Sequence, residues 1–181
     1  MNLSLTKKEA TYIYVSMSTD TGSFRYGSTK ARTHRIVAEL LEYGVGIEAL
    51  NERLYEVFSR EKVRLYSFLL NNIRYEMNGK VAWANLNRRA MRHYGVTEED
   101  TEGFIDFIRM IRGVNIAFFI TEDLDGLLRI SFRSKGEFDV NRLARAFEGG
   151  GHKKAAGCNF SGTVEQAVAR ILEQIKKGSS K

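Results

Sequence analysis

The first 72 residues place their apolar side chains three or four positions apart, which is the spacing of amphipathic helices. The second of these predicted helices is expected to be capped by Thr29 or Ser28 and to end at Gly44. We interpret the fourth helix as a linker between two domains rather than as part of a core. The four predicted helices cover residues 7–17, 30–43, 47–58 and 59–72.

After residue 72 the pattern changes to alternation, which is typical of strands. Asn78-Gly79 predicts a tight hairpin turn. Asp139 is expected to cap one later helix, and Thr163 with Gln166 has the spacing of a capping box for the last one. Strands are expected over residues 73–77, 81–83, 114–121, 127–132 and 158–160, and helices over 87–94, 101–111, 140–147 and 164–175.

Together these elements predict an α/β (α+β) fold in two parts. Residues 1–58 form a helical part, residues 59–72 a helical linker, and residues 73–181 a small mixed-sheet α+β domain. About a hundred residues suffice for a small domain with its own core.

The composition is that of a folded protein, with 43% hydrophobic and 28% charged residues. No apolar run reaches the ~20 residues of a membrane span, and the first residues carry no apolar leader, so we expect a cytoplasmic protein without membrane contact. The single cysteine, Cys158, excludes an internal disulfide and a zinc site built from several cysteines. The net charge of +6 is compatible with a polyanionic ligand such as nucleic acid.

The densest chemical signal is the segment 148–157, which contains Gly149, Gly150 and Gly151 in a row. Without side chains, the backbone N–H groups can approach a ligand together. His152 can donate a hydrogen bond to a phosphate, and the segment 153–156, beginning with Lys153, is expected to start a helical turn that favours an anion. The alternative interpretation is a flexible loop with solvated lysines.

A second signal lies on the predicted strand that ends near residue 133. Because side chains alternate along a strand, Arg129, Ser131 and Arg133 share one face. A planar guanidinium binds phosphate through two N–H groups at once, so Arg133 is a candidate phosphate ligand. On spacing alone, the pattern favours the alternative of an edge strand with solvated arginines. The helix that follows leads back to the glycine segment, so Arg133 and His152 could face one ligand.

The third signal is Asp20, which lies in the hydroxyl-rich segment 18–23 after a helix. Mn²⁺ and Mg²⁺ prefer oxygen ligands, so a carboxylate here is a candidate metal ligand. An Asp before Thr-Gly is more often a turn or cap residue than a metal ligand. One carboxylate by itself does not hold a catalytic metal.

These signals occur in the order found in a known family. Ser-Thr-Asp-Thr-Gly-Ser-Phe-Arg-Tyr at 18–26 and Thr-His-Arg-Ile-Val-Ala-Glu-Leu-Leu at 33–41 resemble the fourth motif region of the DHH phosphoesterases, which are named for an Asp-His-His motif. Later segments resemble the DHH-associated substrate domain: Asp-Thr-Glu-Gly-Phe at 100–104, Ile-Arg-Gly-Val at 111–114, Ser-Phe-Arg-Ser at 131–134, and Gly-Gly-Gly-His at 149–152 with Ala-Ala-Gly at 155–157. The likeness is to the bacterial bifunctional oligoribonuclease and pAp phosphatase subgroup, and it covers nearly the whole chain.

The resemblance implies a manganese-dependent hydrolase of short oligonucleotides or pAp. It assigns Asp20 as a ligand in a site of two Mn²⁺ ions that activate a water molecule. It assigns Arg133 and Ser134 to the substrate phosphate, with the segment Gly149–Gly151, His152 and the adjoining Lys153 holding the same end. Residues 1–58 then correspond to the last part of the catalytic domain.

The chain departs from the family in one respect. The earlier motifs, an Asp-x-Asp, a second strand-end Asp and the Asp-His-His itself, are absent, and His34, His93 and His152 are isolated from one another. We therefore expect an incomplete metal site in this chain alone, with a missing N-terminal catalytic half supplying the other ligands. The apolar faces of the first helices are expected to pack on the second domain or to be covered by a homodimer partner. The alternative is a non-catalytic module that binds nucleotides or oligonucleotides.

Overall fold

The computed structural model describes residues 4–55, 58–123 and 125–179. It divides into two compact units, Met1–Phe58 and Ser59–Lys181, which we call the N-terminal unit and the sheet unit. The division falls where the predicted helical part ends.

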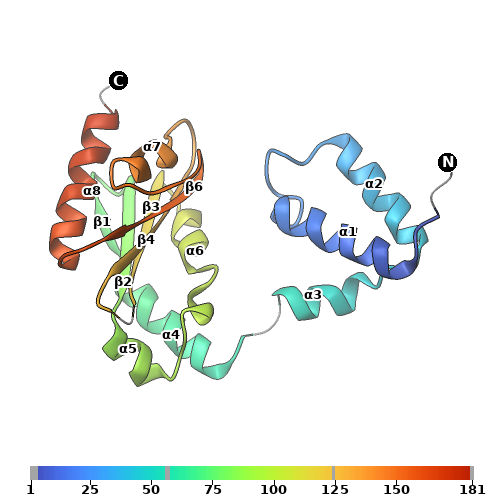
Figure 1. Ribbon diagram of the computed structural model, residues 1–181, viewed down its shortest axis with the longest axis horizontal. Coiled ribbons are helices and arrows are strands. Elements are labelled where there is room, and N and C mark those ends of the chain that lie inside the picture. The colour runs from blue at the N-terminus through green and yellow to red at the C-terminus, as the bar shows by residue number, and fades with distance from the viewer. Residues whose placement is uncertain (1–3, 56–57, 124, 180–181) are drawn as a thin grey trace. The chain divides into compact units, whose positions relative to one another are not determined.

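In its described residues, 4–55 and 58, the N-terminal unit contains three helices around a small core. Thr6 caps the first through a capping box, in which its Oγ1 accepts from Glu9 N at 3.3 Å and its N–H donates to Glu9 Oε2 at 2.8 Å. The buried side chains Ala10, Tyr14 and Leu40 join the first two helices. The helices are α1 (Lys7–Asp20), α2 (Ala31–Glu42) and α3 (Ile47–Tyr55) (Figure 1).

Two details of the predicted helices are corrected here. α1 continues to Asp20, and the Thr19 hydroxyl donates to the Val15 carbonyl oxygen of the same helix at 3.0 Å. Neither Thr29 nor Ser28 caps α2. Lys30 is the N-cap residue, and its N–H donates to Thr33 Oγ1 at 3.1 Å. Residues 56 and 57 of the third predicted helix lie outside the described residues.

The sheet unit is built on a mixed six-stranded sheet in the order β1-β2-β3-β4-β6-β5. β2 and β3 are parallel, and every other neighbouring pair is antiparallel. The strands are β1 (Arg74–Glu76), β2 (Val81–Leu86), β3 (Ile116–Glu122), β4 (Leu128–Ser134), β5 (Gly150–His152) and β6 (Ala155–Phe160). The helices are α4 (Arg60–Asn71), α5 (Arg88–Tyr94), the 3₁₀ turn η1 (Glu99–Thr101), α6 (Phe104–Met110), α7 (Val140–Arg145) and α8 (Val164–Ser179). The predicted α+β fold with a mixed sheet is confirmed.

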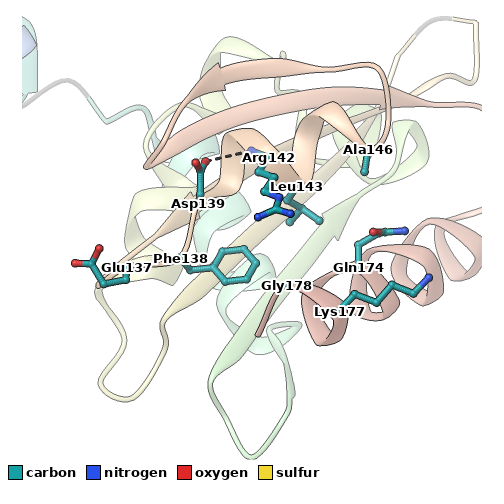
Figure 2. Close-up of a pocket in the computed structure, with 9 residues that line it drawn as sticks. All are labelled: Glu137, Phe138, Asp139, Arg142, Leu143, Ala146, Gln174, Lys177 and Gly178. Carbon is teal, nitrogen blue, oxygen red and sulfur yellow. Dashed lines mark hydrogen bonds between the residues drawn. The ribbon is translucent and has the colours of Figure 1, made fainter. Parts of the chain in front are cut away.

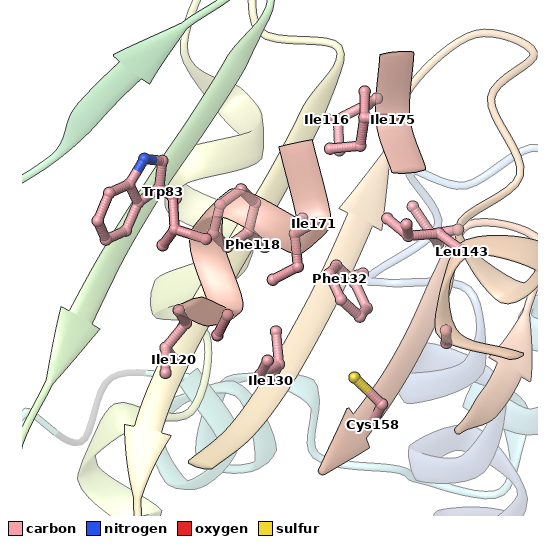
Figure 3. Close-up of a cluster of buried hydrophobic side chains, with 14 of the residues drawn as sticks. Trp83, Ile116, Phe118, Ile120, Ile130, Phe132, Leu143, Cys158, Ile171 and Ile175 are labelled. Atoms are coloured by element: carbon pink, nitrogen blue, oxygen red, sulfur yellow. The ribbon is translucent and has the colours of Figure 1, made fainter. Parts of the chain in front are cut away.

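The two faces of the sheet bury separate cores. α7 and α8 cover one face, where Phe118, Phe132 and Ile171 are fully buried (Figure 3). α4 and α6 cover the other face over β2 and β3, where Ala84, Phe119 and neighbouring side chains pack against them. Alternation along each strand explains the division, because successive side chains point to opposite faces.

α4 is not the linker that the sequence suggested. Leu65 and Leu69 on this helix are fully buried in the core beneath α6 and β2. The sheet unit therefore begins at Ser59, whose side chain caps α4 by accepting from Lys62 N at 3.0 Å.

Two predicted helices have different ends. The segment 101–111 is interrupted at Gly103, which has φ +85°, so a 3₁₀ turn precedes a shorter α6. α8 continues to Ser179 instead of ending before Lys176, and residues 180 and 181 lie outside the described residues. The predicted caps at Asp139 and at Thr163 with Gln166 are confirmed. Among the described helices, none has both the length and the apolar character needed to cross a membrane.

Candidate functional site

Within the described residues of the sheet unit, helices cover only half of the α6 side of the sheet. α4 and α6 pack over β2 and β3, whereas β4, β6 and β5 continue the same face with exposed or half-buried residues. The register places Ser131 of β4 beside Phe119 of β3 and Arg133 beside Ala117, so these residues share the α6 side. We call this uncovered half the open face, and it consists of Arg129, Ser131, Arg133, Gly150, His152, Ala155, Gly157 and Asn159.

The centre of the open face is a floor of small residues. Ser131, Gly157 and Gly150 lie side by side across β4, β6 and β5. Because two of the three have no side chain, a ligand can approach the backbone of the sheet at this row. Substitution at Gly157 is itself restricted, since a Cβ there would lie 3.0 Å from the Ile130 carbonyl oxygen.

Arg133 and His152 stand in the next row. Ala155 lies between them, opposite Arg133 on one side and opposite His152 on the other. Two strand spacings separate their backbones by about 10 Å. Arg133 and His152 therefore lie on the same face of the sheet. That both face one ligand stays a prediction. Their binding roles remain predictions.

Two hollows meet on the open face. One, of about 560 Å³, lies between β4 and the start of α6, and the other, of about 670 Å³, lies along β6. Arg129 and Ser131 line both hollows. Each is within the 300–1,000 Å³ typical of small-ligand sites.

The glycine segment forms a hairpin rather than a loop followed by a helical turn. β5 pairs with β6, and Lys153 and Lys154 form the turn between them. The prediction of a helical turn over 153–156 is wrong, because Ala155 and Ala156 pair with β4 as part of β6. In the described part of the chain no strand pairs with the outer edge of β5, so this edge is the exposed backbone of the hairpin.

Ser134 lies on the wrong side of the sheet to share a ligand with Arg133. It is 3% exposed, and its Oγ donates to the Phe138 carbonyl oxygen at 2.8 Å. Neighbouring residues of a strand point to opposite faces, so Ser134 faces the α7 side. Its side chain holds the turn before α7, and the assignment of this side chain to the substrate phosphate is corrected.

Lys153 has an exposed side chain at the tip of the hairpin. Its Nζ lies 3.3 Å from Glu137 Oε2, and both groups are more than half exposed, so the pair contributes little to stability. Its carbonyl oxygen accepts from Val140 N at 3.0 Å, and Lys154 Nζ donates to the Gly136 carbonyl. These contacts fix the hairpin to the segment before α7. A ligand role for Lys153 remains a prediction.

The two arginines of the open face have different partners. Arg129 Nη1 pairs with Glu98 Oε2 at 2.8 Å, where both side chains are exposed. Arg133 Nε lies 3.4 Å from Asp106 Oδ1. Arg133 Nη1 donates to the carbonyl oxygen of the preceding residue, Phe132, at 3.1 Å. The motifs and periodicity singled out Arg133 but not Asp106. The only local signal for Asp106 is its i,i+3 spacing to Arg109, which says nothing about a contact with β4.

Tyr66 of α4 supports the start of α6. Its hydroxyl donates to the Glu102 carbonyl oxygen at 2.9 Å, and its ring packs edge-on against Phe104. Burial, and to a lesser extent the charge of Asp106, raises the pKa of this phenol above its ordinary value. The phenol therefore stays protonated and keeps donating at neutral pH.

Asp20 is the last residue of α1, in the N-terminal unit, and is exposed. Across residues 4–55, 58–123 and 125–179, no three His, Cys, Asp or Glu side chains come together as a metal site would require. A centre of two Mn²⁺ ions needs several oxygen or nitrogen ligands, so the described residues do not fit that group. Asp20 remains a predicted ligand only.

The opposite face of the sheet carries a further cavity and the single cysteine. A cavity of about 740 Å³ lies between α7 and α8, lined by Phe138, Arg142, Leu143, Lys177 and their neighbours (Figure 2). Cys158 of β6 is 8% exposed in the core on this side, and burial raises the pKa of its thiol to about 11. Neither belongs to the open face.

Comparison with known proteins places this geometry in a family. The DHHA1 domain model matches residues 78–178, which contain the whole open face. The chain belongs to the DHHA1 domain family. The resemblance drawn from the motifs is thereby confirmed at the family level.

Relatives of this DHHA1 chain carry enzyme names. It is 32% identical over 173 residues to the "Bifunctional oligoribonuclease and PAP phosphatase NrnA" of Thermus thermophilus, which covers 95% of this chain and 51% of the relative. The protein of the same name from Bacillus subtilis is 31% identical, covering 95% of this chain and 53% of the relative. The chain thus spans about half the length of the curated relatives it matches.

A solved structure has the same fold. An exopolyphosphatase-related protein from Bacteroides fragilis superposes with a TM-score of 0.89 at 34% identity, covering 95% of this chain and 51% of that one. The DHHA1 fold described above therefore occurs within a longer protein in that case.

Proposed function

We propose that this chain is the substrate-handling part of a phosphoesterase that hydrolyses short oligonucleotides, pAp, or both. The observation that carries the proposal is the open face, where Arg133 and His152 stand beside a floor of Ser131, Gly157 and Gly150. Relatives at 31–32% identity are named oligoribonuclease and PAP phosphatase, which are activities on phosphate esters of nucleotides.

Each part of the open face has a chemical task in this proposal. The Arg133 guanidinium donates charge-assisted hydrogen bonds to a terminal phosphate. His152 donates a further hydrogen bond from the hairpin, and the small residues between them let the nucleotide lie close to the sheet. The net charge of +6 belongs to the sheet unit, because the first 58 residues carry seven Lys and Arg and seven Asp and Glu. An excess of positive charge attracts polyanionic substrates.

Hydrolysis itself is the part of the proposal that reaches beyond the described residues. Two Mn²⁺ ions would supply the activated water, with Asp20 as one ligand. The described residues do not complete that site. We therefore expect this chain alone to bind substrate. Turnover is expected to require further metal-binding residues from outside the described part of the chain.

The test is calorimetric titration of the chain with pAp and with a two- to five-nucleotide RNA, with and without Mn²⁺, while products are assayed. We expect saturable binding of at least one ligand without Mn²⁺. Absence of binding of either ligand would contradict the proposal. Turnover by the purified chain would show that no further metal-binding residues are needed for hydrolysis.

Arg133→Ala is the first variant to titrate. Loss of a charge-assisted phosphate contact is expected to weaken binding by about 1.5–3 kcal/mol, or about 10- to 150-fold. Arg142→Ala is the matched control, since Arg142 is an arginine on α7, across the sheet from the open face. Equal affinity of Arg133→Ala and the parent chain would refute the site.

A further inference from the structure

Asp106 connects the open face to α6. One carboxylate oxygen, Oδ1, lies 3.3 Å from Arg109 Nε on its own helix and 3.4 Å from Arg133 Nε on β4. All three side chains are between 25% and 32% exposed, so solvent screens this cluster less than a fully exposed ion pair. The carboxylate therefore lies between two guanidinium groups at the edge of the proposed binding surface.

These contacts restrict the Arg133 guanidinium without using all of it. Asp106 takes the Nε edge, and the Phe132 carbonyl oxygen accepts from Nη1 at 3.1 Å. A guanidinium has five N–H donors, so donors remain for a phosphate. An arginine held at two points loses less side-chain entropy when a ligand binds, which raises affinity.

The charge of the cluster also suits an anion. Asp106 alone would repel a phosphate, but Arg109 compensates its charge, so the three groups together carry a net charge of about +1. The other arginine of β4 on this face, Arg129, is paired with Glu98 alone. Of the two ion-paired arginines on β4, Arg133 is thus the one whose charged neighbours leave positive charge in excess.

We propose that Asp106 is a positioning residue, which orients Arg133 for the phosphate of the substrate without contacting the substrate itself. This inference rests on the proposed function of the open face. The opposing idea is that Asp106 competes with phosphate for Arg133, which predicts tighter binding once the carboxylate is removed.

A double-mutant cycle separates these ideas. The chain and the variants Asp106→Ala, Arg133→Ala and the double variant are titrated with pAp, and thermal unfolding is followed in each. We expect Asp106→Ala to weaken binding by about fivefold or more, as for residues coupled through a direct contact. In the Arg133→Ala background the same change is expected to have no further effect. A purely structural role would weaken binding in both backgrounds.

Two further variants sharpen the result. Asp106→Asn keeps an acceptor oxygen for Arg133 Nε and is expected to recover most of the affinity, and it also serves if Asp106→Ala does not fold. Glu98→Ala is the matched control, because it removes the carboxylate paired with Arg129 and is expected to leave pAp affinity equal or higher.

The outcomes distinguish this inference from the proposed function. If pAp binds the parent chain and Arg133→Ala weakens it, but Asp106→Ala binds as well as the parent or better, positioning by Asp106 is refuted and the binding face stands. An equal loss from Asp106→Ala in both backgrounds also refutes it. If pAp does not bind the parent chain, both the inference and its pAp-binding basis fall.

Discussion

The three consecutive glycines at 149–151 meet three different surroundings. A Cβ on Gly149 would lie 2.2 Å from the Gly157 carbonyl oxygen, and a Cβ on Gly151 would lie 2.6 Å from the Ala155 carbonyl oxygen. Gly151 also has φ +143°, a conformation that other residues rarely adopt. A Cβ on Gly150, which lies on the open face, would have no neighbouring atom within 4 Å. Two of these glycines are therefore required by packing, and the third is free to serve binding.

Alanine at positions 149 and 150 is expected to separate stability from binding. Gly149→Ala forces backbone apart and is expected to lower the free energy of unfolding by about 1–3 kcal/mol. Gly150→Ala is expected to change it by less than about 0.5 kcal/mol, because the methyl group enters open space. Urea unfolding of the two variants measures this difference.

Titration with pAp completes the comparison. We expect Gly150→Ala to weaken binding although it folds normally, since its methyl group covers part of the floor beside Ser131 and Gly157. Parent-like pAp affinity in this variant would show that the ligand does not approach the sheet at that row.

Strand alternation and the resemblance to a family gave different predictions for residues of the open face and its surroundings. Alternation correctly placed Arg129, Ser131 and Arg133 on one face. The same rule places Ser134 on the other face, although the resemblance assigned it to the phosphate. Asp106 could not be found from sequence, because its contact with Arg133 depends on how α6 crosses β4 and not on any local spacing.

At the scale of elements, α4 shows why a helix can be predicted and its place missed. Its apolar stripe gave the helix, but the residues that bury Leu65 and Leu69 come later in the chain, on β2 and α6. The hairpin at 150–160 shows the same limit. The sequence of Lys153–Ala156 is compatible with a helical turn, and pairing with β4 makes part of it a strand. The predicted caps at Asp139 and Thr163 were correct, because these side chains bond to backbone groups two or three residues away. The cap predicted for α2 was wrong, because Lys30 takes that position.

Neighbouring leucines on α4 test whether it belongs to the core. Leu69 is fully buried, whereas Leu70 is 39% exposed. Leu69→Ala is expected to lower the free energy of unfolding by about 2–5 kcal/mol through loss of burial and the cavity it leaves. Leu70→Ala is expected to cost less than about 1 kcal/mol. Equal small effects in chemical denaturation would return α4 to the role of a linker.

In the whole molecule, the two units differ both in net charge and in the size of their hydrophobic cores. The N-terminal unit is electrically balanced and has a core of few side chains, whereas the sheet unit holds the excess positive charge and two cores. Such a sheet unit has what an independent domain needs, namely its own buried interior. Every residue of the open face belongs to the sheet unit. The proposed function therefore assigns substrate binding to this unit.

The buried thiol of Cys158 can report how often the core of the sheet unit opens to solvent. Thiolate is the reactive form, and a thiol with a pKa of about 11 in a closed core reacts slowly with alkylating reagents near pH 8. The same pKa, raised from about 9, means that Cys158 stabilises the folded chain fully below pH 9 and that this contribution is lost as the pH rises toward 11. We expect the unfolding free energy of the parent to fall across that window more steeply than that of Cys158→Ala.

The rate at which Cys158 is alkylated then measures transient opening of the sheet. The Cys158 side chain lies on the α7 side of the sheet, although the residue also lines the hollow along β6. A nucleotide bound beside Arg133 and His152, which do not line that hollow, is expected to slow the reaction by stabilising the closed sheet. When opening is in rapid equilibrium, the slowing is expected to equal one plus the ratio of free pAp to its dissociation constant. A rate of modification measured on β6 would thus report, from the far side of the sheet, how tightly the nucleotide is held.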